Sequence, residues 1–266
     1  MASDLRMFLI GMPGEGKTTF ISSIPKALIL DYENGACGIP FARAVRVHID
    51  NPEKHHQVMK KLIADGKAKT APFKHIVIDS IDQCVDMLGE ELGTEKKVEH
   101  FSEYGDKGAG WGLLRNRFWM DVEALQSAGY SWTIIGHMTE KTIRVNKQDI
   151  TVQRPCIYDS INKLVYRNCD VFARMSSITK VERPDVEKII NGRPVNVPGP
   201  ETRTTTYYFD AAKTPSNYSG GKVRGVPSFK TRLILPDKDG WDIVNAEYNT
   251  AVAKEKKRIS ELSGQR

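Results

Sequence analysis

The chain has 266 residues, of which 27% are charged, and a formal net charge of +6. This length fits one α/β domain with elaborations, and the modest excess of basic residues suits a polyanionic partner without establishing one. No basic amino-terminal segment precedes a long apolar stretch, and no run approaches about eighteen apolar residues, so we expect neither secretion nor a membrane span.

The cysteine pattern excludes two further classes of protein. None of the four cysteines belongs to a C-x-x-C pair, so we expect neither a zinc site nor a disulfide scaffold. Free thiols in a reducing cytoplasm are the expected state. The cysteines are Cys37, Cys84, Cys156 and Cys169.

A phosphate-binding loop follows the first predicted strand. The apolar run Leu5–Ile10 predicts a buried strand and residues 19–24 continue as a helix, while residues 11–18 match the pattern G-x-x-x-x-G-K-[ST] at every position. Glycines let backbone N–H groups curl around a phosphate, and the helix start adds its positive dipole end. The residues expected to bind the nucleotide are Gly11, Met12, Pro13, Gly14, Glu15, Gly16, Lys17, Thr18 and Thr19.

Strands and helices then alternate along the chain. The sequence predicts strands at Ala27–Asp31 and Val45–Ile49, a helix from Pro52 to Gly66, a strand at His75–Ser80 and a helix through residues 85–92. Such alternation implies a parallel sheet with right-handed crossovers.

The second half of the chain changes character. The predicted elements are a loop at 102–112, a helix at 114–125, a strand at Ser131–Gly136 ending at His137, a hairpin at 141–153, several strands in 170–235 and a basic helix at 243–262. We therefore divide the chain into an ATPase domain at 1–240, with an inserted hairpin or DNA-binding loop at 141–157, and a basic carboxy-terminal helix or tail at 241–266.

Polar residues stand where three predicted parallel strands end, and ligands of such sheets bind at that edge. Asp79 follows an apolar strand and is expected to hold Mg²⁺ together with Thr18, although an N-cap role is the alternative. Glu33 is a candidate to activate water, or a surface glutamate. His137 is a candidate to donate an N–H to the γ-phosphate, or a structural histidine. Lys17 is expected to reach the β- and γ-phosphates.

The segments 30–33, 76–80 and 134–137, together with the phosphate-binding loop, resemble the ATPase core of the RecA superfamily. They are most similar to phage-encoded ATPases of single-strand annealing. The resemblance implies that Glu33 is the general base, that Asp79 ends the magnesium-binding strand and that His137 couples the ATP state to a DNA-binding loop. RecA commonly has glutamine at the position of His137, so the histidine is a departure.

The resemblance is weaker from Asp170 to Pro236, where two strands resemble the closing strands of a RecA core. There, lysines act on the ATP of a neighbouring subunit, which makes Lys213 a catalytic candidate, with Lys222 and Arg224 behind it. Solvated loop cations are the alternative.

The resemblance also implies DNA-binding loops, which correspond here to residues 102–112 and 138–157. Cations interleaved with aromatic residues suit DNA binding, because the charges attract phosphates and the rings stack on bases, and ordinary loop residues are the alternative. Their candidate residues are Tyr104, Lys107, Trp111, Lys141, Arg144, Lys147 and Arg154. Residues 254–258 are a candidate for a second electrostatic contact with DNA, and a solvated helix face is the alternative.

The sequence thus predicts an α/β protein with a RecA-like P-loop NTPase core, an antiparallel β extension and a carboxy-terminal helix. The resemblance implies Mg²⁺-dependent ATP hydrolysis coupled to binding of single-stranded DNA and to its annealing or strand pairing. We expect a homo-oligomeric ring or filament in the cytoplasm, with a single-strand DNA-binding protein as a further partner. Ser80 stands where AAA+ machines usually carry glutamate, which disfavours that class. A small-metabolite phosphotransferase and a nucleotide-gated interaction module remain as alternatives.

Overall fold

The computed structural model describes residues 5–35, 39, 42–145, 148–190, 193–211, 222–236 and 238–263. Its main sheet has the strand order β12-β10-β7-β1-β5-β4-β2-β3. The strands from β7 to β3 in this order run parallel, whereas β10 pairs antiparallel with β7 and β12 pairs antiparallel with β10. The strand bounds are β1 Met7–Gly11, β2 Ala27–Asp31, β3 Val45–His48, β4 His75–Asp79, β5 Ser131–Val145, β7 Val171–Glu182, β10 Thr202–Asp210 and β12 Arg232–Leu235.

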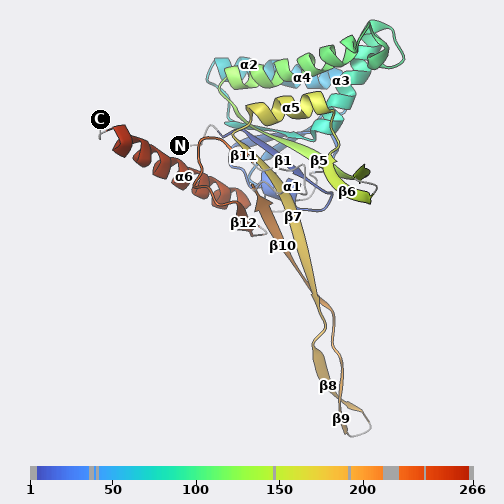
Figure 1. Ribbon diagram of the computed structural model, residues 1–266, viewed down its shortest axis with the longest axis vertical. Coiled ribbons are helices and arrows are strands. Elements are labelled where there is room, and N and C mark those ends of the chain that lie inside the picture. The colour runs from blue at the N-terminus through green and yellow to red at the C-terminus, as the bar shows by residue number, and fades with distance from the viewer. Residues whose placement is uncertain are drawn as a thin grey trace.

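Helices cover both faces of this sheet (Figure 1). One face carries α2 (Pro52–Lys67), α3 (Ile81–Lys96), α4 (Ala109–Ser127) and α5 (Asp159–Asn168). The other face carries α1 (Lys17–Ser22) and the start of α6 (Gly240–Ser263), whose far end projects from the body. Within the described chain, no helix is long and apolar enough to cross a membrane.

Two apolar cores result because successive residues of a strand point to opposite faces of the sheet. In β1, Phe8 and Ile10 join the core beneath α2 to α5, whereas Met7 and Leu9 join the core beneath α1 and α6. All four side chains are at most 1% exposed. A strand buried on both faces reads as a continuous apolar run, which is why the sequence located β1, β2 and β4.

Two antiparallel ribbons extend from the parallel strands. β5 pairs with β6 (Gln148–Pro155) to form the hairpin that the sequence predicted around residues 141–153. The longer ribbon is built from β7 and β10 and is continued by β8 (Asp185–Ile190) and β9 (Arg193–Pro198), far from the body of the sheet (Figure 1). The short strand β11 (Lys222–Val223) pairs with Val171 and Phe172 at the start of β7, at the other end of that strand from the ribbon.

The structure confirms the predicted α/β class with a mostly parallel sheet, corrects two element boundaries and adds one helix. The strand expected to end at His137 continues to Val145, because its backbone changes partner from β1 to β6 after that residue. The loop expected at 102–112 contains a short 3₁₀ helix, η1 (Phe101–Glu103), and the first residues of α4. Helix α5 was not predicted, since only Ile161 and Val165 mark its buried face.

His75 supplies a test of this packing. It is buried against Trp241, its Nε2 lies 2.7 Å from the Thr133 hydroxyl, and burial lowers its pKa to about 3. An unfolded histidine has a pKa of about 6.5, so the unfolded chain binds the proton more tightly and stability falls as pH drops below that value. We expect wild type to lose about 1.4 kcal/mol per pH unit more than His75→Gln in urea unfolding below pH ~6.5. Parallel pH profiles of the two proteins would contradict this expectation.

Candidate nucleotide site

The phosphate-binding loop joins the end of β1 to the start of α1. Gly14 and Gly16 have φ angles of +80° and +81°, a left-handed conformation that favours glycine. A Cβ on Gly16 would also lie 2.7 Å from the ring of Tyr207 on β10. The loop therefore needs glycine at Gly16 for two independent reasons, and it rests against the base of the long ribbon.

Lys17 is held inside the loop. Its Nζ donates to the carbonyl oxygens of Gly11 and Met12, each at 2.8 Å, and the residue is 5% exposed. Burial lowers the pKa of the Lys17 ammonium, while the nearby carboxylates of Glu15 and Asp79 oppose that shift. Lys17 is thus a buried cation whose ammonium group is held by two carbonyl oxygens of the loop. Bound phosphates would replace these oxygens as its partners.

Glu15 has a role that the sequence pattern did not indicate. Its carboxylate turns back to accept a hydrogen bond from the Met12 N–H at 2.6 Å, and it lies 3.5 Å from the guanidinium of Arg174 on β7. Both side chains are largely buried, with exposures of 14% and 18%. Glu15 therefore braces the loop against β7, and only its backbone remains available for phosphate.

Thr18 and Asp79 form a pair of oxygen donors that fits Mg²⁺. Thr18 Oγ1 lies 3.5 Å from Asp79 Oδ2 at the end of β4. Burial, together with the charges of Glu33 and Asp31, raises the pKa of Asp79 to about 7, and a cation at this position would favour its ionised form. Mg²⁺ is commonly held by one or two such side chains together with nucleotide phosphates and water.

Glu33 and His137 come together although 104 positions separate them. His137 Nδ1 lies 3.2 Å from Glu33 Oε1 and 3.1 Å from Asp82 Oδ2, and the Ser80 hydroxyl donates to Glu33 Oε1. Because ionised carboxylates only accept hydrogen bonds, Nδ1 carries a proton. The hydrogen bond to Asp82 and the charge of Glu33 raise the pKa of His137 despite partial burial.

Asp82 anchors this histidine from α3. Besides contacting Nδ1, its Oδ2 accepts a hydrogen bond from the backbone N–H of His137 at 2.8 Å. His137 itself lies opposite Gly11 in the pairing of β1 with β5, directly beside the phosphate-binding loop. Asp82 could not be found from sequence, because it lies beyond the strand end in the first turn of an ordinary helix.

The turn that carries Glu33 is fixed by the preceding aspartate. The Asp31 carboxylate accepts hydrogen bonds from the N–H groups of Glu33 at 3.0 Å and Gly35 at 3.3 Å, and it is fully buried. Arg46 of β3 neutralises it, with Nε 2.5 Å from Asp31 Oδ2. A buried carboxylate with a charge partner and several donors is stable, so this turn is a rigid support for Glu33.

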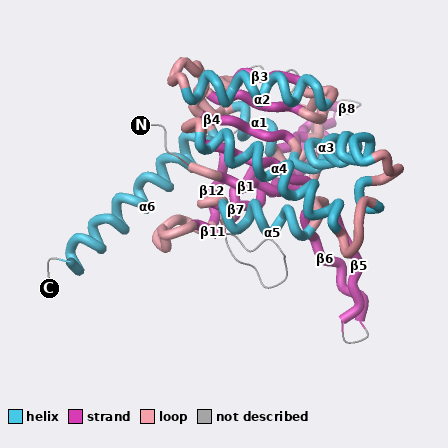
Figure 2. Tube along the Cα trace, turned by 90° about the horizontal axis from the view of Figure 1, so that it is seen from above, coloured by secondary structure: helices cyan, strands magenta, loops and turns pink. Residues whose placement is uncertain are grey.

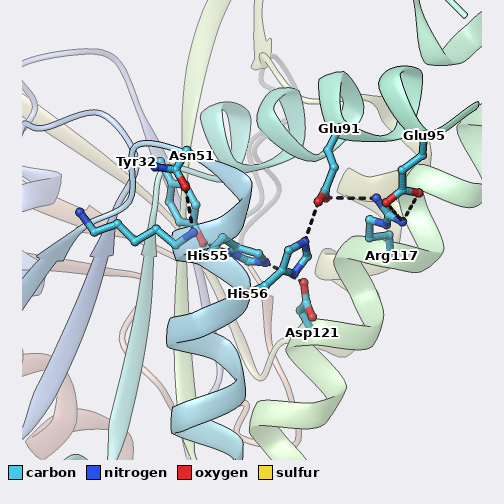
Figure 3. A network of polar contacts seen from close by, with 9 residues as sticks. Tyr32, Asn51, His55, His56, Glu91, Glu95, Arg117 and Asp121 are labelled. Carbon is cyan, nitrogen blue, oxygen red and sulfur yellow. Dashed lines mark hydrogen bonds and ion pairs between the residues drawn. The ribbon is translucent and has the colours of Figure 1, made fainter. Parts of the chain in front are cut away.

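A second network holds the neighbouring Tyr32 (Figure 3). The Tyr32 hydroxyl lies 2.8 Å from Nδ1 of His55 on α2, and His55 Nε2 lies 3.0 Å from a carboxylate oxygen of Asp121 on α4. This buried chain links the end of β2 to two helices. On the solvent side, His56 contacts Glu91 of α3, which also pairs with Arg117 of α4.

The adjacent histidines His55 and His56 provide a matched test of these networks. His55→Ala should lower the free energy of unfolding by about 2–4 kcal/mol, because it leaves a cavity and the buried Tyr32 hydroxyl without its partner. His56→Ala removes only an exposed pair, worth at most about 1 kcal/mol. Urea unfolding of both variants measures the difference. Equal losses of unfolding free energy in the two variants would show that the buried Tyr32–His55–Asp121 chain stabilises the fold no more than the exposed pair does.

The remaining candidates lie apart from this cluster. Lys213 falls outside the described residues, so its trans-acting role stays a prediction. Lys222 donates to the Tyr166 carbonyl oxygen at 2.7 Å, and Arg224 donates to that of Arg167, so both cations cap the end of α5. Lys147 also lies outside the described residues.

A family model described as an AAA domain matches residues 3–221 of the chain. The match takes in the phosphate-binding loop and the three strand ends that carry Glu33, Asp79 and His137. No curated protein matches the chain significantly. Ser80, whose position disfavoured an AAA+ machine, does not exclude an AAA-type domain, and in this chain its hydroxyl contacts Glu33 instead.

Proposed function

Because the chain belongs to the AAA domain family, whose members are ATPases of the P-loop type, we propose that it hydrolyses ATP to control binding and annealing of single-stranded DNA. The convergence of Lys17, Thr18, Asp79, Glu33 and His137 at one edge of the sheet carries the hydrolysis part of this proposal. Bound Mg²⁺ would neutralise phosphate charge beside Thr18 and Asp79.

Glu33 is the group that activates water. Its carboxylate is about one quarter exposed, is oriented by Ser80 and His137, and stands on the rigid turn built by Asp31. A general base must be positioned within hydrogen-bonding reach of its water, and this support supplies the positioning. The raised pKa of His137 favours the doubly protonated ring, which would donate from Nδ1 to the two carboxylates and from Nε2 to the γ-phosphate.

DNA binding is supported by the continuity of β5. The strand that carries His137 runs without interruption into the β5–β6 hairpin, which carries the exposed Arg144 and the half-buried Arg154. A shift of His137 on contact with the γ-phosphate would therefore be transmitted along β5 to that hairpin. Nucleotide state would then set DNA affinity through the difference between ATP-bound and ADP-bound forms.

Self-assembly is supported by the long ribbon. A two-stranded ribbon is marginally stable alone, and this one exposes Ile178 and Val181 by 56% and 52%. A second copy of the chain would cover these residues. The base of the ribbon touches the phosphate-binding loop through Tyr207 and Arg174, so assembly and nucleotide binding would be linked.

The test is the affinity of the full chain for a fluorescent oligo(dT) in ATP, ADP and nucleotide-free buffer, together with annealing of two complementary strands. We expect tighter binding in one nucleotide state and faster annealing in that state. ATP turnover with transfer of phosphate to a small acceptor, without DNA binding, would support a phosphotransferase and overturn the proposal. Nucleotide-dependent association without turnover would instead identify an interaction module.

A further inference from the structure

The two segments that the sequence marked as DNA-binding candidates meet at one cavity. Trp111 near the start of α4 and Arg154 on β6 both line a cavity of about 450 Å³, between the β5–β6 hairpin and the start of α5. Figure 2 shows this hairpin leaving the body beside α5. The other lining residues are Thr139, Pro155, Cys156, Ile157, Tyr158, Asp159 and Ser160.

A second cavity connects this one to the nucleotide site. It has a volume of about 340 Å³ and shares Cys156, Ile157 and Tyr158 with the first, and it reaches His137 and Asp82 at its other end. We call the two together the Trp111–His137 groove. The groove thus begins at aromatic side chains and ends at the histidine that contacts the candidate base Glu33.

The lining residues of the groove suit a base and not a phosphate. The Trp111 and Tyr158 rings lie 4.3 Å apart at 74°, and both remain half-exposed, which suits stacking on an unpaired base. Asp82 and Asp86 lie on the inner wall and repel phosphate, but carboxylates accept hydrogen bonds from the amino groups of bases. Asp82 Oδ1 is buried and, among the described residues, has no hydrogen-bond partner.

We propose that the Trp111–His137 groove takes one unpaired base of single-stranded DNA, stacked at Trp111 and Tyr158, with its phosphate outside on Arg154. This inference rests on the proposed function and adds the residues that contact the DNA. A base N–H, such as the ring N3–H of thymine, would donate to the carboxylate edge that Asp82 and Asp86 present to the second cavity. Base occupancy would then act on the same aspartate that anchors His137, which links DNA binding to the hydrolysis site.

Cys156 is a reporter at the junction of the two cavities. It is exposed, whereas Cys84 and Cys169 are buried, so a Cys37→Ser background leaves one accessible thiol in the described chain. We expect saturating oligo(dT) to slow maleimide modification of Cys156 by about tenfold or more, because a stacked base covers it. Duplex DNA of the same length, whose bases are paired, should protect it much less.

Variants separate base binding from general electrostatic attraction. Arg154→Gln should weaken oligo(dT) binding by roughly tenfold, whereas Lys61→Gln, which removes an equal charge from the exposed face of α2, should have little effect. Tyr158→Leu should weaken binding by a similar factor to Arg154→Gln. Because Tyr158 also packs against Phe101, the thermal unfolding of the Tyr158→Leu variant is measured alongside. If that variant is destabilised, the protection of Cys156 in the chain with native Tyr158 still tests the groove.

The outcomes distinguish this inference from the proposed function. Oligo(dT) binding with protected Cys156 and weakened Arg154→Gln supports both. Oligo(dT) binding with unchanged Cys156 reactivity, and with Arg154→Gln equal to Lys61→Gln, overturns the groove and leaves DNA binding in place. Absence of oligo(dT) binding in every nucleotide state overturns the proposed function and the groove together.

Discussion

Replacing Lys17 by methionine is expected to lower the catalytic efficiency of ATP hydrolysis by about 10²–10³-fold and to weaken ATP binding. The lysine is the one buried cation among the phosphate-loop residues, and its Nζ already lies within the loop at the Gly11 and Met12 carbonyl oxygens. Methionine keeps the aliphatic stem and removes the charge. Phosphate release and titration with a fluorescent ATP analogue measure the two losses.

The matched control for Lys17→Met is Lys60→Met, which removes a cation from the exposed face of α2. That variant should bind and hydrolyse ATP as wild type does. If Lys17→Met turned over ATP at a rate close to that of Lys60→Met, the loop at residues 11–18 would not be the phosphate site.

Replacing Glu33 by glutamine is expected to leave ATP binding nearly unchanged and to lower the rate of hydrolysis by about 10²–10⁴-fold. Glutamine has nearly the same volume and still offers an oxygen to Ser80 and His137, so the turn should persist, but an amide cannot take a proton from water. Phosphate release under saturating ATP measures the rate, and analogue titration measures binding.

Ser80→Ala provides the comparison for Glu33→Gln. It removes the hydroxyl that orients the carboxylate while keeping the carboxylate itself. Its loss of rate should be smaller than that of Glu33→Gln. The reverse order would assign the essential role to the serine and would remove Glu33 as the base.

Much of this site could be predicted from sequence because strand ends are easy to find. β1, β2 and β4 are buried on both faces and appear as continuous apolar runs, so Glu33 and Asp79 are placed at one edge by topology alone. His137 was found in the same way, although its strand continues beyond it. The glycines of the loop also indicate, from sequence alone, where the backbone adopts a left-handed conformation.

The supporting residues could not be predicted, because their roles depend on pairings across long stretches of chain. Arg174 reaches Glu15 from β7, and Asp82 reaches His137 from the first turn of α3. Neither residue stands in a recognisable pattern. The meeting of Trp111 with Arg154 likewise depends on how α4, α5 and the hairpin pack together, and helix α5 was itself missed.

The charge of the carboxy-terminal helix illustrates a similar limit. Its first turns bury Trp241 and Val244 against the sheet, as a core helix would, whereas Ile259 and Leu262 near its end remain more than half exposed. Composition gives the basic face but not where the helix leaves the body. Contact of residues 254–258 with DNA, and the division of the chain at residue 240, stay predictions.

The most direct test of the account is the steady-state rate of ATP hydrolysis with and without single-stranded DNA, measured for wild type and Glu33→Gln. We expect DNA to raise the wild-type rate and to have no such effect in the variant, because DNA would act through the β5–β6 hairpin and His137 on the site that Glu33 completes. A wild-type rate that is indifferent to single-stranded DNA, or a variant that is stimulated as strongly as wild type, would contradict it.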